Sequence, residues 1–156
     1  MKQLIEAFDQ RFLALEQRSR ALIEKTPGDL LFQKPRDVPR SSCGEYVLRS
    51  AGVVEKTFGG ITTRLWDDPF EWTLPEAFAG PLDVLAYLSE TEDTRRAGFA
   101  YLKSDEDLTR EIPSPEKLRS LFEILLETLA RAEHLQGRAF AVFQILSDDK
   151  LPRFDK

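Results

Sequence analysis

Apolar residues recur every three or four positions over the first stretch of the chain, and charged residues fill the positions between them. This spacing places the apolar side chains on one face of an α-helix. Pro27 and Gly28 follow the stretch, and such a pair typically ends a helix. We therefore predict a first helix over residues 2–25. Its apolar face comprises Leu4, Ile5, Phe8, Phe12, Leu15, Leu22 and Ile23.

A second helix is predicted from Ser42 to about Trp66. Either Ser41 or Ser42 is a good N-cap residue, and Glu45 stands three residues after Ser42, which is the spacing of a capping box. Three glycines lie inside this helix, and each costs about 1 kcal/mol relative to alanine. They indicate either the close approach of a neighbouring helix or ligand, or a local kink. The apolar positions are Val47, Val54, Phe58, Ile61 and Leu65, and the glycines are Gly52, Gly59 and Gly60.

Residues 67–80 form a long connection that is rich in aromatic residues, and we expect it to be ordered against the body of the protein. Pro81 then suits the first turn of a third helix, which is predicted to end near Lys103. A short helical turn is expected over residues 105–111. The aromatic residues of the connection are Phe70, Trp72 and Phe78.

A fourth and longest helix is predicted from Ser114 to about Leu146. Ser114, Pro115 and Glu116 combine an N-cap residue, a proline at the first position and an acid in the first turn. The apolar positions lie about 3.5 residues apart on average, which suits nearly antiparallel packing of long helices. No alternating β-branched run is long enough for a sheet. The pattern predicts an all-α fold, an antiparallel four-helix bundle that forms one domain over residues 1–156.

The amino-acid composition adds expectations about binding partners and the cellular compartment. The 156 residues fit one domain and carry a formal net charge of -5, with lysine and arginine scattered along the chain. A nucleic-acid-binding protein usually shows a basic patch, so no nucleic-acid partner is expected. A single cysteine cannot form an internal disulfide. We expect neither a signal peptide nor a membrane span, and hence a cytoplasmic protein with no membrane partner.

The predicted apolar faces turn polar near the middle of three helices. The interruptions are Ser50 on the second helix, Glu92 and Arg95 on the third, and Glu133 and Gln136 on the fourth. Mid-helix positions meet at one level in an antiparallel bundle, and burying such groups costs a few kcal/mol unless they pair or reach water. Two interpretations follow. The polar groups form a paired internal network with partly exposed helix edges, or they line a ligand pocket.

Neither the single histidine nor the single cysteine belongs to a recognisable catalytic or metal-binding motif. His134 is the only histidine, whereas a zinc site normally needs three or four side-chain ligands, so no metal ion is expected. Cys43 is predicted at the start of the second helix, where backbone amides lower a thiol pKa. It is interpreted either as a nucleophile or as a small buried residue beside the helix cap.

The order of these segments resembles that of the DinB/YfiT-like superfamily. The similar segments are Ser-Ser-Cys-Gly-Glu at residues 41–45, Leu-Arg-Ser-Ala-Gly-Val-Val-Glu at residues 48–55 and Ala-Glu-His-Leu-Gln-Gly-Arg at residues 132–138. The resemblance extends over nearly the whole chain and consists mostly of helix pattern. It implies an up-down-down-up four-helix bundle that is often a homodimer. Many members bind a divalent metal through three histidines, and some act as thiol-dependent transferases.

This chain departs from the family pattern at the metal ligands. The family places one histidine on the second helix, five residues before an acid, and here Ser50 stands five residues before Glu55. The last helix of the family usually reads His-x-x-His-His-x-Gly-Gln. In the matching stretch Arg131 and Leu135 replace the ligand histidines, and His134 matches only the histidine that is not a ligand. The comparison with the family pattern therefore implies no metal and no other cofactor for this chain.

These observations support one preferred hypothesis and two alternatives. The preferred hypothesis is a metal-free DinB-like bundle that binds a small molecule or a partner in a polar pocket at the middle of the bundle. The first alternative is a thiol transferase that holds a metal in an unfamiliar way, and the second is a structural homodimer. The predicted pocket residues are Arg49, Ser50, Glu92, Arg95, Arg131 and His134.

Overall fold

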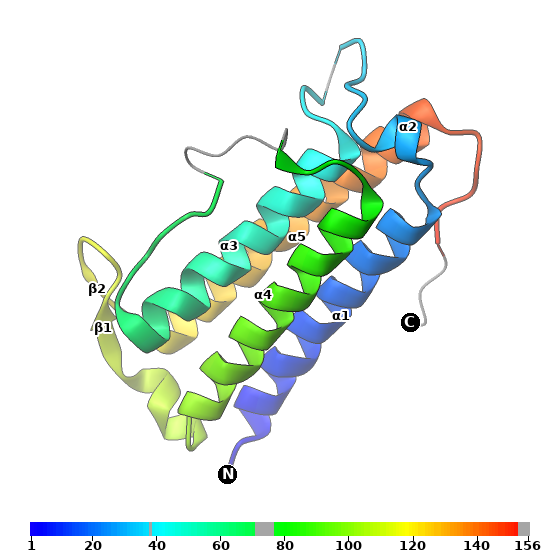
Figure 1. Cartoon of the computed structure of the whole chain (residues 1–156). Helices are drawn as coiled ribbons and strands as arrows, with labels where there is room; N and C mark the ends of the chain where they lie inside the picture. The colour runs from blue at the N-terminus through cyan, green and yellow to red at the C-terminus, as the bar shows by residue number, and fades with distance from the viewer. Residues whose placement is uncertain (38, 71–76, 153–156) are drawn as a thin grey trace.

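Four long helices lie side by side and make up most of the protein (Figure 1). The computed structural model describes residues 1–37, 39–70 and 77–152. In the view of Figure 1, α1 and α5 run upward and α3 and α4 run downward. The all-α class predicted from the sequence is confirmed. The long helices are α1 (Gln3–Lys25), α3 (Cys43–Thr63), α4 (Pro81–Tyr101) and α5 (Leu121–Leu146).

The helices form a closed ring in the order α1, α4, α3, α5. Helix α3 packs most extensively on α5 and then on α4, and α1 packs on α4 and α5. Helices α1 and α3 touch little, because they lie on a diagonal of the ring. Two short elements fill the connections, α2 (Gly28–Leu31) after α1 and a 3-10 helix, η2 (Asp105–Thr109), after α4. The second of these is the short helical turn that the sequence predicted.

The predicted start of the last helix at Ser114 is wrong. Strands β1 (Glu111–Pro113) and β2 (Leu118–Ser120) form an antiparallel hairpin there instead. A 2.9 Å hydrogen bond from Ser114 N to Lys117 O closes its turn. Helix α5 begins after it, and the Ser120 hydroxyl accepts a hydrogen bond from Glu123 N at 3.1 Å. The true start has the serine-to-acid spacing of three that also marks Ser42 and Glu45, and Ser-Pro-Glu suits a turn as well as a helix start.

The predicted cap of α3 is confirmed, and the glycines inside this helix are explained by the segment that follows it. The Ser42 hydroxyl accepts a hydrogen bond from Glu45 N at 3.1 Å. The helix ends three residues earlier than predicted, because Arg64 adopts a left-handed conformation with φ of 63°. The chain then folds back along α3. A Cβ added at Gly60 would lie 2.2 Å from the Trp66 ring.

Phe70 approaches the same helix at Gly52, where an added Cβ would lie 2.9 Å from the ring. The close approach therefore comes from the connection, not from a neighbouring helix. Phe70 is buried and its ring packs edge-to-face against Tyr87, with centroids 5.1 Å apart. Phe78 packs against both rings. The aromatic connection is thus ordered against the body at these positions, and Trp72 lies outside the described residues.

Helix α1 receives its N-terminal cap from a distant part of the chain. The Asp105 carboxylate accepts hydrogen bonds from Leu4 N and Ile5 N, at 3.0 Å each for the shorter contacts. Lys2, at the N-cap position, offers no side-chain bond of its own. Desolvation acts to raise the pKa of Asp105, but the backbone hydrogen bonds outweigh it and hold the pKa below its usual range. An acid at this place also interacts favourably with the helix dipole.

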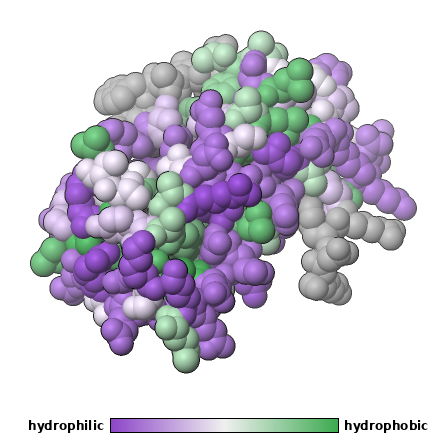
Figure 2. Space-filling view, turned by 60° about the horizontal axis from the view of Figure 1, so that its bottom comes forward, coloured by the Kyte–Doolittle hydropathy of each residue, from purple (hydrophilic) through white to green (hydrophobic). Residues whose placement is uncertain are grey.

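The core consists of two apolar clusters, one in the upper half and one in the lower half of Figure 1. The upper cluster includes Leu22, Val47, Leu48, Val84 and Phe143. The lower cluster includes Phe12, Phe58, Ile61, Leu121 and Leu125. Most of the face seen in Figure 2 is hydrophilic, with separate apolar areas between the charged side chains. None of the described helices is both long and apolar enough to cross a membrane.

Two glycine substitutions test the packing of the connection on α3. Gly60→Ala forces a shift of the Trp66 ring, and we expect it to lower the free energy of unfolding by about 1–3 kcal/mol despite the better helix propensity of alanine. Gly137→Ala is the matched control, because nothing lies within 4 Å of its added Cβ. It should raise the free energy of unfolding by about 0.5–1 kcal/mol. Urea unfolding measures both, and a stabilised Gly60→Ala protein would contradict the packing described.

Candidate functional site

A belt of buried polar side chains separates the two apolar clusters. Gln136 on α5 donates hydrogen bonds from Nε2 to Leu15 O at 2.7 Å and to Ser19 Oγ at 2.8 Å, both on α1. Ser50 on α3 donates to Ala132 O on α5 at 2.7 Å. Ser50 and Gln136 are 1% and 3% exposed, so these bonds satisfy groups that water does not reach. The predicted internal network is present at these positions.

Arg95 is the charged member of this belt and is only 4% exposed. Its guanidinium pairs with the Asp9 carboxylate of α1 and lies 3.5 Å from Glu92 Oε1, one turn away on α4. Asp9 is half exposed, so one partner of this buried cation still reaches solvent. The Nε atom of Arg95 is buried and has no hydrogen-bond partner among the described residues. The pairing with Asp9 joins α4 to α1.

A small cavity lies beside Arg95, between α1, α3 and α4. Ser50, Glu92 and Arg95 line it together with Glu16 and Ser19, and apolar side chains complete the wall. Its volume of about 20 Å³ is enough for about one water molecule, since one water needs roughly 10–15 Å³ by the same measure. Pockets for drug-sized molecules are far larger, about 300–1,000 Å³. The cavity is therefore a hydration site in size, not a ligand pocket.

The six predicted pocket residues do not gather in one place. Ser50, Glu92 and Arg95 line the small cavity. Arg131 lines a separate groove, and Arg49 and His134 are exposed. The reason is helix geometry, because successive residues point about 100° apart. Arg49 therefore points away from its buried neighbour Ser50.

The same geometry accounts for the last helix. Ala132 and Gln136 face inward from α5, so His134 between them points outward. Glu133, which the sequence places in the polar belt, is also outside it. Its side chain is 45% exposed and pairs with Arg18 at 3.0 Å.

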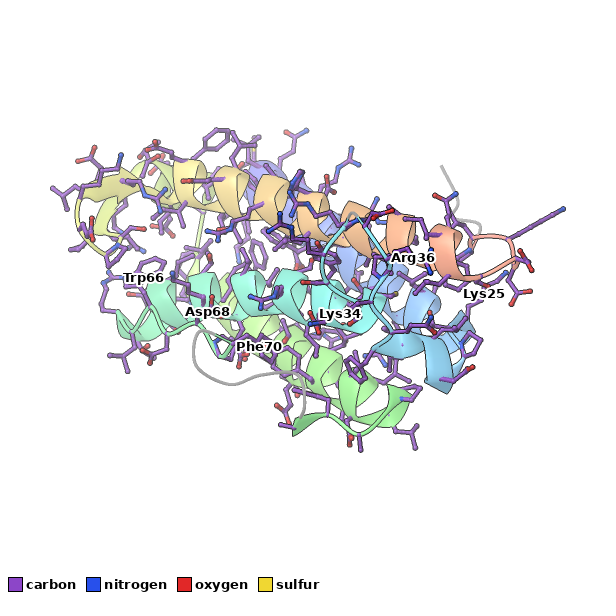
Figure 3. All side chains as sticks on the ribbon, turned by 90° about the horizontal axis from the view of Figure 1, so that it is seen from above. Lys25, Lys34, Arg36, Trp66, Asp68 and Phe70 are labelled. Carbon is purple, nitrogen blue, oxygen red and sulfur yellow. The ribbon has the colours of Figure 1, made fainter. Side chains whose placement is uncertain are left out.

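The groove that contains Arg131 lies between α3 and α5. Its walls also include residues of the segment after α3 and of the β1–β2 hairpin, and its volume is about 100 Å³. The lining is more polar than apolar. Figure 3 shows Trp66 and Asp68, which belong to this lining, beside α3. The other residues used below are Lys56, Thr57, Arg119, Thr128 and Arg131.

Sequence reasoning missed most of this groove. Arg119 belongs to a hairpin that was predicted to be helix, so its position could not be anticipated. The inward positions of Thr57 and Thr128 could have been inferred from residue spacing. Thr57 lies seven residues after Ser50, and Thr128 lies eight before Gln136, so each shares a helix face with a member of the polar belt. Their hydroxyl groups form a hydrogen bond of 2.7 Å across the two helices.

The electrostatics of the groove favour negative charge. Three basic and two acidic side chains line it, and the basic excess contrasts with the net charge of -5 on the chain. Arg119 pairs with Glu127, and Asp68 accepts a hydrogen bond from Phe70 N at 2.9 Å. Lys56 and Arg131 form no ion pair with any described residue. Two cations therefore line the groove without a direct ion pair to a described residue, and the five charged side chains together leave a net charge of +1.

Glu55, which stands at the acid position of the family pattern, is engaged in a structural contact. The Tyr87 hydroxyl donates a hydrogen bond of 2.5 Å to Glu55 Oε2. Burial, together with the nearby Glu55 carboxylate, raises the pKa of Tyr87 above its usual range, so the phenol stays protonated. Among the described residues, no three His, Cys, Asp or Glu side chains gather closely enough to hold a metal ion.

Cys43 is a buried residue at the first position of α3. It is 1% exposed, and Thr26 Oγ1 lies 4.0 Å from its Sγ atom. Burial raises the pKa of the thiol to about 12, although the contact with Thr26 acts in the opposite direction. The thiol is therefore protonated at neutral pH, whereas a nucleophilic cysteine must supply a thiolate. Of the two interpretations of Cys43, the geometry supports the buried capping-region residue.

No protein-family model matches this chain, and comparison with curated proteins and with solved structures likewise found no match. The function is accordingly argued from the geometry of the groove.

Replacing Arg95 tests the buried ion pair. Arg95→Met removes the cation that Asp9 and Glu92 share, and we expect it to lower the free energy of unfolding by about 1–3 kcal/mol. Arg96→Met is the matched control, because Arg96 also pairs with Glu92, at 2.9 Å, but is 66% exposed. Its effect should stay within about 0.5 kcal/mol. Equal losses for both variants in urea unfolding would show that burial of Arg95 contributes nothing.

Thiol labelling tests the state of Cys43. A buried, protonated thiol reacts only when the structure opens, so we expect Ellman's reagent at pH 8 to label the folded protein at least roughly a hundredfold more slowly than the unfolded chain. The unfolded protein in guanidinium serves as the control for the reagent. Rapid labelling of the folded protein would contradict the assignment and revive Cys43 as a nucleophile.

Proposed function

We propose that this chain is a DinB-like, up-down-down-up bundle that binds a small molecule without metal, in the groove between α3 and α5. The observation that carries the proposal is a polar groove to which four separate segments contribute and in which Lys56 and Arg131 form no ion pair with a described residue. Arg131 is exposed and Lys56 is partly buried, and an anion between two such cations is favoured by their electrostatic attraction to it. A ligand supplies that negative charge here.

The directions of the long helices support the DinB-like assignment. Helices α1 and α5 run one way and α3 and α4 the other, which is the order that the resemblance implies (Figure 1). The positions of the family's metal ligands, occupied here by Ser50, Arg131 and Leu135, lie on the two helices that pack together most extensively. At one of these positions Arg131 places a basic side chain where the family has a histidine, and Lys56 adds a second cation from α3.

The dimensions of the groove limit the kind of ligand. A volume of about 100 Å³ is well below the roughly 300–1,000 Å³ that encloses a drug-sized molecule. The groove therefore suits the polar head of a small molecule, and the remainder of the molecule lies outside. The proposed binding site is therefore at the surface between α3 and α5, where Arg131 lies, and not at Arg95 in the middle of the bundle.

A ligand screen with two readouts tests the proposal. The Trp72→Phe variant leaves Trp66 as the sole tryptophan, and Trp66 lines the groove. We expect at least one compound in a panel of small acids and thiols to raise the melting temperature by about 5 °C or more near saturation and to change the Trp66 emission. A panel in which no compound changes both signals would overturn the proposal. Thermal shifts without any change in Trp66 emission would place binding elsewhere and would also count against it.

A further inference from the structure

We propose that the groove between α3 and α5 binds a dianionic phosphate group, held by Lys56, Arg131 and Arg119. This inference rests on the proposed function and names the ligand class of the same site. Three observations carry it: the unpaired cations, an unused hydroxyl proton and the state of Arg119.

The two unpaired cations match the charge of a phosphate monoester. Lys56 extends from α3 and Arg131 from α5, and both line the groove. A phosphate group carries about -1.5 to -2 charge at pH 7, so one such group compensates both side chains. A carboxylate has one charge and two oxygens, so it offers fewer acceptors to the two cations than the three terminal oxygens of a phosphate group do. Guanidinium groups and lysine ammonium groups both donate hydrogen bonds to phosphate oxygens in proteins.

The threonine pair on the floor of the groove has a proton left to donate. Thr57 and Thr128 are each 6% exposed, and their hydroxyl oxygens lie 2.7 Å apart. One hydroxyl donates to the other, and the proton of the accepting hydroxyl has no acceptor among the bonds formed by the described residues. A buried donor without an acceptor costs about 1–3 kcal/mol. A phosphate oxygen in the groove accepts this proton, whereas an ammonium ligand, which has no lone pair, does not.

Arg119 is held in place by the protein and lines the hairpin side of the groove. Its guanidinium pairs with Glu127 and donates to Ser114 Oγ at 2.8 Å, which fixes the side chain against the hairpin. A side chain fixed in this way loses little freedom when a ligand binds. Arg119 thus places a third basic side chain in the groove, on the side of the hairpin.

Titration with simple anions tests the inference in the Trp72→Phe protein. The probes are inorganic phosphate, phenyl phosphate, sulfate and acetate, with chloride at matched ionic strength. We expect phosphate and phenyl phosphate to change the Trp66 emission saturably at pH 7.5 and to raise the melting temperature. Acetate and chloride should do neither. Tighter binding of acetate than of phosphate would overturn the inference in favour of a carboxylate ligand.

The pH dependence separates a dianion site from general salt effects. Phosphate loses its second charge near pH 6, so its affinity should fall by several-fold between pH 7.5 and 5.5. Sulfate stays doubly charged over this range and should bind equally well at both values. The charged groups that face the site are Lys56, Arg119, Arg131, Asp68 and Glu127. A parallel change for sulfate would assign the pH effect to these side chains and count against recognition of the second phosphate charge.

Three substitutions locate the site. Lys56→Gln and Arg131→Gln each remove one unpaired cation and should weaken phosphate binding about tenfold or more, as expected for a charge-assisted hydrogen bond. Arg11→Gln is the control, because Arg11 is an exposed cation on α1 outside the groove. It should leave phosphate binding unchanged. Circular dichroism verifies that the variants fold, and equal weakening by all three substitutions would overturn the site.

The outcomes distinguish this inference from the proposed function. If phosphate leaves Trp66 unchanged at 10 mM while another compound of the panel binds the groove, the phosphate assignment is wrong and the binding function stands. If neither phosphate nor any other compound affects Trp66, both are wrong.

Discussion

Buried polar groups at the middle of the bundle need hydrogen-bond partners, and this requirement fixes the axial positions of the long helices relative to one another. Gln136 reaches from α5 to Leu15 and Ser19 on α1, and Ser50 ties α3 to Ala132 of α5. A shift of any of these helices by one turn would leave an amide or hydroxyl unpaired, at a cost of about 1–3 kcal/mol for each group. The apolar clusters above and below are non-directional and would tolerate such a shift more readily. The polar belt therefore specifies the register that the clusters stabilise.

The groove between α3 and α5 follows from that register and from two connections. With Ser50 bonded to Ala132, Thr57 and Thr128 come opposite each other further along the same pair of helices. The segment after α3 and the hairpin before α5 both contribute residues to this level, one bringing Trp66 and the other Arg119. The basic side chains of the groove come from α3, α5 and the hairpin, so the site depends on the whole tertiary structure and not on one helix.

Local signals in the sequence predicted much of the fold and little of the site. The start of the helix at Ser42 was predicted correctly, because the serine, the acid three residues later and the apolar pattern that follows all indicate the same start. Ser114 failed because its signal fits a turn as well as a helix start, and only the pairing of β1 with β2 decides between them. Buried Ser50, Arg95 and Gln136 could be identified as interruptions of an apolar face. The groove could not be predicted, because it depends on how the connections fold back, as Gly60 beneath Trp66 illustrates.

The cap that Asp105 provides for α1 has a consequence for the order in which the protein is built. The carboxylate that completes the first turn of α1 lies about a hundred residues further along the chain, and ribosomes add roughly 5–20 residues per second. For at least several seconds of synthesis α1 exists without its cap and without α4 and α5, the helices against which it packs. Isolated helices are only marginally stable in water. Until the later helices are made, α1 is therefore an amphipathic segment with frayed ends. Its apolar face is during that interval a natural substrate for chaperones.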